Sequence, residues 1–347
     1  MRSAWKQPLF LIGFGIIAFF LIGSFVYEGL YGNVPKQTFF IEENGRAVEG
    51  PPISPNWEHP LGTDQFGYDM FGKIMLGAKY TILAAMAVAA LRMLIAVPLG
   101  FSLGTYLQRH RLWINGLIDP IHYVPMTIFA AILLSPILWM PEEGFSTTSF
   151  ERIGAQVVIM ALMTVPIVAS LVGNEANLLY QNEYIMAART LGASRRRIII
   201  RHLFPQMREK MFVLYGQQIV ETLIVFAHLG LLQLFLGGTD VDYDPMFSDP
   251  PRSISYEWAG LFGNSFRYLQ GAPWLPLGPA ISFALVILAI AAMIEGYTRA
   301  TNGQVKMPKR QKMAFVSDET IEWNQQQLKD KMALLHLNEK GREKVKS

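Results

Sequence analysis

The chain lacks cysteine and has few charged residues. Among its 347 residues there is no cysteine, and only 16% are Asp, Glu, Lys or Arg, whereas 51% are hydrophobic. The absence of cysteine excludes disulfides and thiolate metal sites. Soluble proteins of this length rarely have so few charges, so the composition, together with apolar stretches of ~20 residues, predicts a membrane protein. The modest net charge of +3, without an aromatic and basic platform, argues against nucleic-acid binding.

The sequence also lacks a catalytic or nucleotide-binding pattern. It has no glycine-rich loop ending in Gly-Lys-Ser or Gly-Lys-Thr, so we expect no ATP binding by this chain. Its histidines are scattered without the spacing of metal ligands. Asp240, Asp242 and Asp244 alternate as in a calcium loop, but Pro245 and Pro251 stand where that loop needs glycine and glutamate. We therefore expect no catalytic residues, no metal site and no cofactor, and we interpret the acidic stretch as a solvated loop.

Six apolar segments have about the length that crosses the hydrocarbon core, ~20 residues. We expect an all-α membrane protein with six transmembrane helices. The first span has no small-residue cleavage site, so we interpret it as a helix and not as a signal peptide. The six segments run over about 10–27, 78–106, 121–140, 153–172, 212–236 and 277–297.

Lysine and arginine gather in alternate segments between the spans. The basic segments are those with Arg2 and Lys6, Arg109 and Arg111, residues 189–210, and Arg299. With six spans they all fall on one side, which predicts that both termini are cytoplasmic. The opposite segments, 28–77, 141–152 and 237–276, are rich in Asp and Glu.

These spans suggest four parts of the chain. Residues 1–27 form the N-terminal segment and first helix, 28–77 an extracytoplasmic segment, 78–300 a five-helix core, and 301–347 a cytoplasmic tail. The core includes a cytoplasmic loop at 180–208 and an outer loop at 237–276. Apolar residues recur near helical spacing in the tail, which predicts an amphipathic surface helix; contact with lipid or a partner is the alternative.

The cytoplasmic loop has the most informative pattern in the sequence. Two adjacent alanines permit close packing against another helix, and a glycine four residues later can end the first helix in a left-handed conformation. A basic second helix follows, and we expect the proline thirteen residues after the glycine to stop it. The residues that carry the pattern are Glu183, Ala187, Ala188, Gly192, Arg195, Arg201 and Pro205.

This loop resembles the EAA loop of bacterial ABC importer permeases, on which a separate ATPase subunit docks. It departs from the family pattern at Met186, where glutamate is usual, and at His202 and Phe204. The resemblance implies a type I ABC importer permease fold and a membrane subunit whose ATPase, with its ATP and Mg, is on other chains. An ordinary positive-inside loop would also carry arginine, but it would not explain the spacing.

A second segment, His59-Pro-Leu-Gly-Thr-Asp64-Gln-Phe-Gly-Tyr-Asp69, is similar to the one before the second span in permeases of the oligopeptide, dipeptide and nickel family. It departs from them at Tyr68, where arginine is usual. Further matches extend the resemblance over about 59–300 and point to the second permease of such importers. We expect Asp64 or Asp69 to cap a helix at the outer interface.

Three ionisable residues fall inside predicted spans: Arg92, Glu221 and His228. A charge at the bilayer centre costs about 2.5–3.5 kcal/mol on insertion scales, so each should face a partner or a water-filled path. For Arg92 we expect an acidic or carbonyl partner, with Glu221 the first candidate. For Glu221 a structural ion pair and a place on the transport path are both open.

The resemblance implies an importer permease of a prokaryotic plasma membrane that works with a second homologous permease, two ATPase subunits and an extracytoplasmic substrate-binding protein. A peptide is the implied substrate, and nickel or a metal chelate is the alternative within the family. The binding protein should dock on the acidic outer segments. A secondary transporter that uses Arg92, Glu221 and His228 as an ion relay is the other class, but it leaves the loop spacing unexplained and lacks an inverted repeat.

Overall fold

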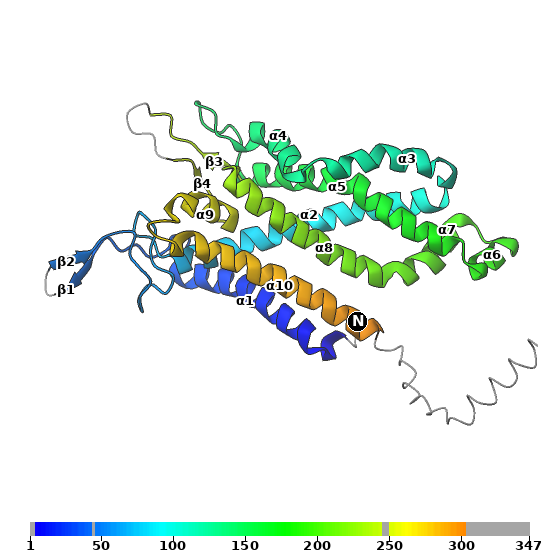
Figure 1. Cartoon of the computed structure of the whole chain (residues 1–347), viewed down its shortest axis with the longest axis horizontal. Coiled ribbons are helices and arrows are strands. Elements are labelled where there is room, and N and C mark those ends of the chain that lie inside the picture. The colour runs from blue at the N-terminus through cyan, green and yellow to red at the C-terminus, as the bar shows by residue number, and fades with distance from the viewer. Residues whose placement is uncertain (1–3, 44–45, 245–249, 303–347) are drawn as a thin grey trace, which may run out of the picture. The chain divides into compact units, whose positions relative to one another are not determined.

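The computed structural model describes residues 4–43, 46–244 and 250–302, which are mostly helical (Figure 1). The described residues up to Thr301 form one compact unit, and the predicted tail helix lies outside the described residues. In chain order the elements are η1 (Ala4–Lys6), α1 (Pro8–Tyr31), β1 (Ile41–Glu43), β2 (Arg46–Glu49), α2 (Met70–Thr105), η2 (Gln108–His110), α3 (Arg111–Ile118), η3 (Asp119–Tyr123), α4 (Met126–Leu138), α5 (Ser149–Tyr180), α6 (Glu183–Thr190), α7 (Arg195–Ile198), η4 (Ile199–Leu203), α8 (Phe204–Leu231), β3 (Thr239–Asp240), β4 (Arg252–Ser253), α9 (Trp258–Ser265), η5 (Phe266–Tyr268) and α10 (Trp274–Asn302).

Five helical stretches of the described chain are long and apolar enough to cross a membrane: α1, α2, α5, the stretch from Arg195 to Leu231, and α10. Each overlaps a predicted span. The third predicted span, 121–140, is not one continuous helix. It is divided between η3 and the 13-residue helix α4. Pro125 causes the break, because a proline disfavours the helical conformation of the residue before it.

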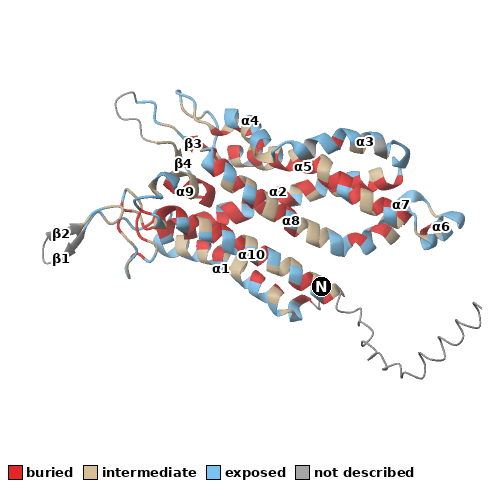
Figure 2. Cartoon of the chain, viewed as in Figure 1, coloured by how far each residue is buried: buried red, intermediate tan, exposed pale blue. Residues whose placement is uncertain are grey.

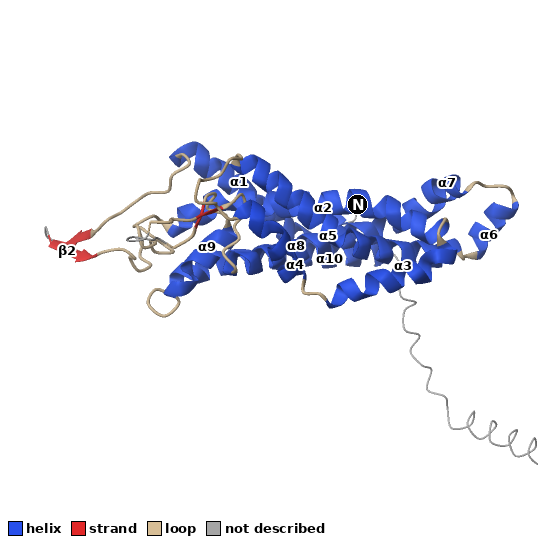
Figure 3. Ribbon diagram, turned by 90° about the horizontal axis from the view of Figure 1, so that it is seen from above, coloured by secondary structure: helices blue, strands red, loops and turns tan. Residues whose placement is uncertain are grey.

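The long helices lie side by side along one axis, with α6 and α7 at the end opposite β2 (Figure 3). Buried residues concentrate where α2, α5 and α8 face one another (Figure 2). Helices α2 and α5 approach closely at Gly104, where a Cβ would lie 2.6 Å from the carbonyl oxygen of Gly173. Only glycine allows the two backbones to meet there, so α2 and α5 pack closely against each other.

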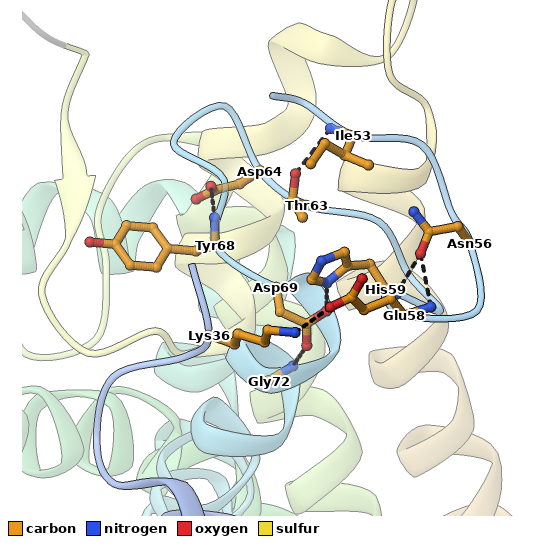
Figure 4. A network of polar contacts seen from close by, with 10 residues as sticks. All are labelled: Lys36, Ile53, Asn56, Glu58, His59, Thr63, Asp64, Tyr68, Asp69 and Gly72. Carbon is orange, nitrogen blue, oxygen red and sulfur yellow. Dashed lines mark hydrogen bonds and ion pairs between the residues drawn. The ribbon is translucent and has the colours of Figure 1, made fainter. Parts of the chain in front are cut away.

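The segment before α2 is fixed by a polar network (Figure 4). Asp69 is the N-cap of α2, and its Oδ2 accepts a hydrogen bond from the backbone N–H of Gly72 at 2.7 Å. Its Oδ1 lies 3.0 Å from Nδ1 of the buried His59. Asp64 instead accepts hydrogen bonds from the N–H groups of Phe66 and Tyr68, each at 2.9 Å. The predicted capping role is therefore confirmed for Asp69, and Asp64 holds the preceding turn.

A short helix in the outer loop, α9, is anchored in the core by Trp258, which is fully buried. Its backbone N–H donates to Oγ1 of Thr81 at 3.0 Å, and its indole Nε1 donates to the carbonyl oxygen of Ile74 at 2.8 Å. The ring makes edge-to-face contacts with Phe20 of α1 and Phe283 of α10. One side chain therefore joins the outer loop to three membrane helices.

The N-terminus of α9 is capped by Glu257, a carboxylate that is only 1% exposed. Its Oε1 accepts from the N–H of Gly260 at 2.7 Å and of Leu236 at 3.2 Å, and its Oε2 accepts from the N–H of Ala259 at 2.7 Å. Glu257 therefore ties α9 to the segment that follows α8. Burial raises the pKa of Glu257 to about 7, against the opposing effect of these three donors.

This raised pKa predicts a pH-dependent stability. Between about pH 5 and 7 the folded protein holds a proton that the unfolded chain has released, so stability falls by roughly 2 kcal/mol as the pH rises through this window. The stabilisation is complete below the unfolded pKa and is lost above the folded one. Thermal unfolding of the solubilised protein from pH 5 to 8 measures the effect.

The matched control for this measurement is Glu257→Gln, which keeps the shape of the side chain and does not titrate. All other titrating groups are shared, so the difference between the two proteins isolates Glu257. We expect the difference to change with pH. A constant difference across the range contradicts the prediction.

Candidate functional site

The predicted docking loop consists of two short helices joined by a tight turn at one end of the bundle (Figure 1). Gly192 follows the last turn of α6 with φ of +86°, the left-handed conformation expected for it. Its N–H donates to the carbonyl oxygen of Arg189 at 2.9 Å, and the N–H of Ala193 donates to that of Ala188 at 3.0 Å. These two bonds form a Schellman motif, which ends α6 and fixes the direction in which the chain leaves it.

The second helix of the loop, α7, is capped by Ser194, whose hydroxyl accepts a hydrogen bond from the N–H of Arg197. The prediction that Pro205 stops this helix is wrong. The chain continues from α7 through η4, a five-residue π-helical segment, into α8, where Pro205 lies in the first turn. A proline ring clashes with the carbonyl four residues earlier in an α-helix, and the wider π turn before it relieves this clash. The second helix of the loop and α8 therefore form one uninterrupted helical stretch, Arg195–Leu231.

Three fully buried side chains hold the loop against the bundle: Ile185 of α6, Ile198 of α7 and Leu203 of η4. Arg195 lies over the ring of Tyr106 at the end of α2, 5.4 Å from its centroid. These contacts give the loop a fixed position although it is short. Elements of this length have no stable conformation alone, so the buried contacts determine the shape of the loop.

The outward surface of the loop is apolar and basic. Leu191 at its tip is 88% exposed, Ile200 is 59% exposed and Met186 is 55% exposed. Clusters of exposed large apolar side chains on one surface are typical of protein contacts. Of the predicted residues, Ala188 is half-buried and the others are exposed. They lie in α6, the turn after it, α7, η4 and the first turn of α8: Glu183, Ala187, Gly192, Arg195, Arg201 and Pro205.

A second polar site lies inside the bundle around Arg92 of α2, which is 2% exposed. Its Nη1 donates to Oε1 of Gln218 at 2.6 Å and lies 3.4 Å from Oε2 of Glu221; both partners are on α8. Its Nη2 donates to the carbonyl oxygen of Met160 on α5 at 3.2 Å. Arg92 thus contacts both kinds of partner expected for it, an acid and a carbonyl, and it connects three membrane helices.

The three ionisable residues predicted inside the spans do not form one group. The side chain of Glu221 is 42% exposed and lines an open groove of ≈ 430 Å³ between α8 and α10, together with Glu295. His228 lies two turns further along α8, and its Nδ1 is 3.2 Å from Oγ1 of Thr127 on α4. The hydrogen bond assigned to His228 therefore goes to a different helix, away from Arg92 and Glu221.

Sequence reasoning missed Gln218, which makes the shortest hydrogen bond to Arg92. It lies three residues before Glu221 and so shares its face of α8, a helical spacing that could have identified it. In the described ranges, no group of three or more His, Cys, Asp or Glu side chains is arranged to hold a metal ion.

Comparison with known proteins agrees with this architecture. Residues 96–301 match the family described as the binding-protein-dependent transport system inner membrane component. The dipeptide transport system permease protein DppC of Alkalihalophilus pseudofirmus is 27% identical over 88% of this chain and 90% of its own length. The glutathione transport system permease protein GsiD of Pectobacterium atrosepticum is 25% identical over 88% of this chain and 91% of its own length. The resemblance to ABC permeases of the oligopeptide and dipeptide type is thereby confirmed, and this multi-pass membrane protein belongs to the family of binding-protein-dependent transport system inner membrane components.

Proposed function

We propose that this chain is the permease subunit of an ATP-driven importer for peptides and that it forms the translocation path with a second homologous permease. The names of its relatives, which are permeases for dipeptides and glutathione, support a peptide substrate. Nickel or a metal chelate is the alternative within the family. ATP and Mg then belong to two separate ATPase subunits, and this chain has no catalytic role.

The observation that carries the proposal is the docking loop. It is held by buried residues and exposes an apolar and basic surface at one end of the bundle. A motor protein can transmit force only through a rigid element, and the Schellman turn and the buried contacts make this loop rigid. Ala187 is exposed, so its role in close packing requires a helix of another chain, which in this proposal is the ATPase.

The helical connection explains how movement reaches the membrane. The stretch from Arg195 to Leu231 is helical throughout, and it carries Gln218 and Glu221. A displacement of the loop by ATP binding therefore moves these two side chains relative to Arg92 on α2. Glu221 lines the groove between α8 and α10, so the groove changes shape when the loop moves.

In this proposal the loop end is cytoplasmic and both termini are on the same side. The third of six membrane crossings is made by α3, η3 and α4 together, because each of these elements contacts α5. The extracytoplasmic binding protein docks at the other end, on residues 28–77 and 237–276. The family relation disfavours a secondary transporter, and the separate position of His228 weakens the proposed ion relay.

Cysteine crosslinking tests the docking loop directly, since the chain has no native cysteine. We expect Ala187→Cys and Leu191→Cys to crosslink to an ATPase chain in gently solubilised membranes. The matched control is Asp242→Cys, an exposed position in the outer loop, which should give no such product. If no position from 183 to 205 crosslinks to an ATPase chain, the loop does not dock one.

A further inference from the structure

An apolar cavity of ≈ 300 Å³ lies between α1 and the rest of the bundle. Ile17 and Leu21 of α1 and Tyr215 and Ile219 of α8 line it. Met86 of α2 and Ile290 of α10 also belong to the lining. The hydroxyl of Tyr215 bonds to the carbonyl oxygen of Met86 at 3.3 Å, so the one polar atom of this lining is already satisfied.

The cavity stays open because α1 is fixed to other helices on both sides of it, toward its N-terminus and toward its C-terminus. Toward its N-terminus, α1 meets α10 at Gly13, where a Cβ would lie 2.2 Å from the carbonyl oxygen of Ala289. Toward its C-terminus, Ser24 bonds to the carbonyl oxygen of Leu76 on α2 at 3.3 Å, and Glu28 pairs with Lys79. Between these anchors α1 cannot move against α8 to fill the space.

The occupant must be apolar and must come from the bilayer. A water molecule needs two to four polar partners, and this lining offers none. An empty cavity of this size is unfavourable, because its walls lose their dispersion contacts. The cavity lies at mid-length of α1 and α8, both membrane-crossing stretches, and its rim includes Phe14 and Ile22 of α1, which are 45% and 63% exposed. At that depth the rim meets the hydrocarbon region of the membrane.

We propose that this cavity binds one acyl chain of a membrane phospholipid, which packs between α1 and α8. The family match begins at residue 96, so α1 and the contribution of Met86 are outside it. The bound acyl chain then fills the space between α1 and α8 and stabilises the packing of α1 against the other helices. The proposal requires only that the helices cross a membrane and does not depend on which substrate is transported.

Photolabelling tests the site. The full complex is reconstituted with a phosphatidylglycerol that carries a diazirine midway along one acyl chain, extracted in detergent to remove loosely bound lipid, and irradiated. We expect peptide mapping to find label on Ile17, Leu21, Tyr215 and Ile219, at least roughly tenfold above Ile12 on the exposed face of α1.

Variants of Ala18, which lines the cavity, make the test specific. Ala18→Trp should reduce the labelling by roughly tenfold and the smaller Ala18→Leu by less, because occupancy follows the remaining space. Ile12→Trp is the matched control on the same helix, away from the cavity, and should not change it. Equal labelling of Ile12 and the cavity, labelling unaffected by either Ala18 variant, or a crosslink from a protein segment at these residues overturns the proposal. ATPase binding, measured in the same samples, reports separately on the proposed function.

Discussion

Replacing Arg92 by leucine is expected to lower the free energy of unfolding by about 2–4 kcal/mol. The change removes hydrogen bonds to Gln218 and to the carbonyl oxygen of Met160, and both acceptors lie where water cannot replace the donor. It also removes the positive charge beside Glu221, 3.4 Å away. The measurement is the thermal or denaturant-induced unfolding of the solubilised complex.

A double-mutant cycle ranks the two partners on α8. Hydrogen bonds between a charged and a neutral group contribute about 1.5–3 kcal/mol, whereas ion pairs open to solvent contribute roughly 0–1 kcal/mol. The Arg92–Gln218 bond is buried and 2.6 Å long, and Glu221 is 42% exposed at 3.4 Å. We therefore expect the Arg92→Leu and Gln218→Leu changes to be coupled more strongly than Arg92→Leu and Glu221→Leu.

The control for charge alone is Arg92→Lys. Lysine keeps the positive charge, but its single ammonium group cannot reach α5 and α8 together as the guanidinium does. Its stability should fall between those of the original protein and Arg92→Leu. Additive effects in both cycles contradict the assigned partners, and a stronger coupling with Glu221 than with Gln218 reverses their order.

Replacing Gly192 by valine is expected to abolish most uptake and to weaken ATPase binding while the protein still inserts into the membrane. The backbone φ of +86° is strained for a residue with a Cβ, at a cost of roughly 1–2 kcal/mol, and a β-branched side chain makes it worse. No atom lies within 4 Å of the position that a Cβ would take, so no clash contributes. The expected defect arises from the turn alone, because the altered turn would change the orientation of α6 relative to α7.

The matched variant is Gly192→Asn, because asparagine adopts left-handed conformations more readily than other residues. It adds a side chain of similar size, so it separates backbone strain from bulk at the docking surface. We expect uptake close to that of the original protein. Equal losses in both variants show that bulk is responsible, and normal uptake with valine excludes a need for the left-handed turn at this position.

The features that the sequence predicts are local ones. The spacing from Ala187 to Gly192 predicts a short helix with a glycine stop, because the Schellman motif depends only on a few adjacent residues. The cap at Asp69 is local in the same way. The roles of these residues can be predicted without knowledge of the rest of the chain.

The features that the sequence does not predict depend on contacts between distant residues or on competition between two local signals. Proline normally interrupts an α-helix, so Pro205 alone predicts a helix end. The helix continues there only because a π turn precedes the proline. Pro125 interrupts the third span although the hydropathy there is continuous. The partners of Arg92 come from helices more than 60 residues away in the chain, so the cost of a buried charge predicts that partners exist but not that Gln218 is the closest.

The π turn also sets an angle. A π turn adds one residue to an α-helix, and each residue of an α-helix rotates the chain by about 100° about its axis. The direction in which the docking surface points, relative to Gln218 and Glu221 further along α8, is therefore set by a single residue in the segment Ile199–Leu203. An insertion or deletion there turns the surface by more than a quarter of a revolution while each half of the helix remains intact. A single insertion or deletion can therefore change the angle, about the helix axis, between the docking surface and the groove that Glu221 lines.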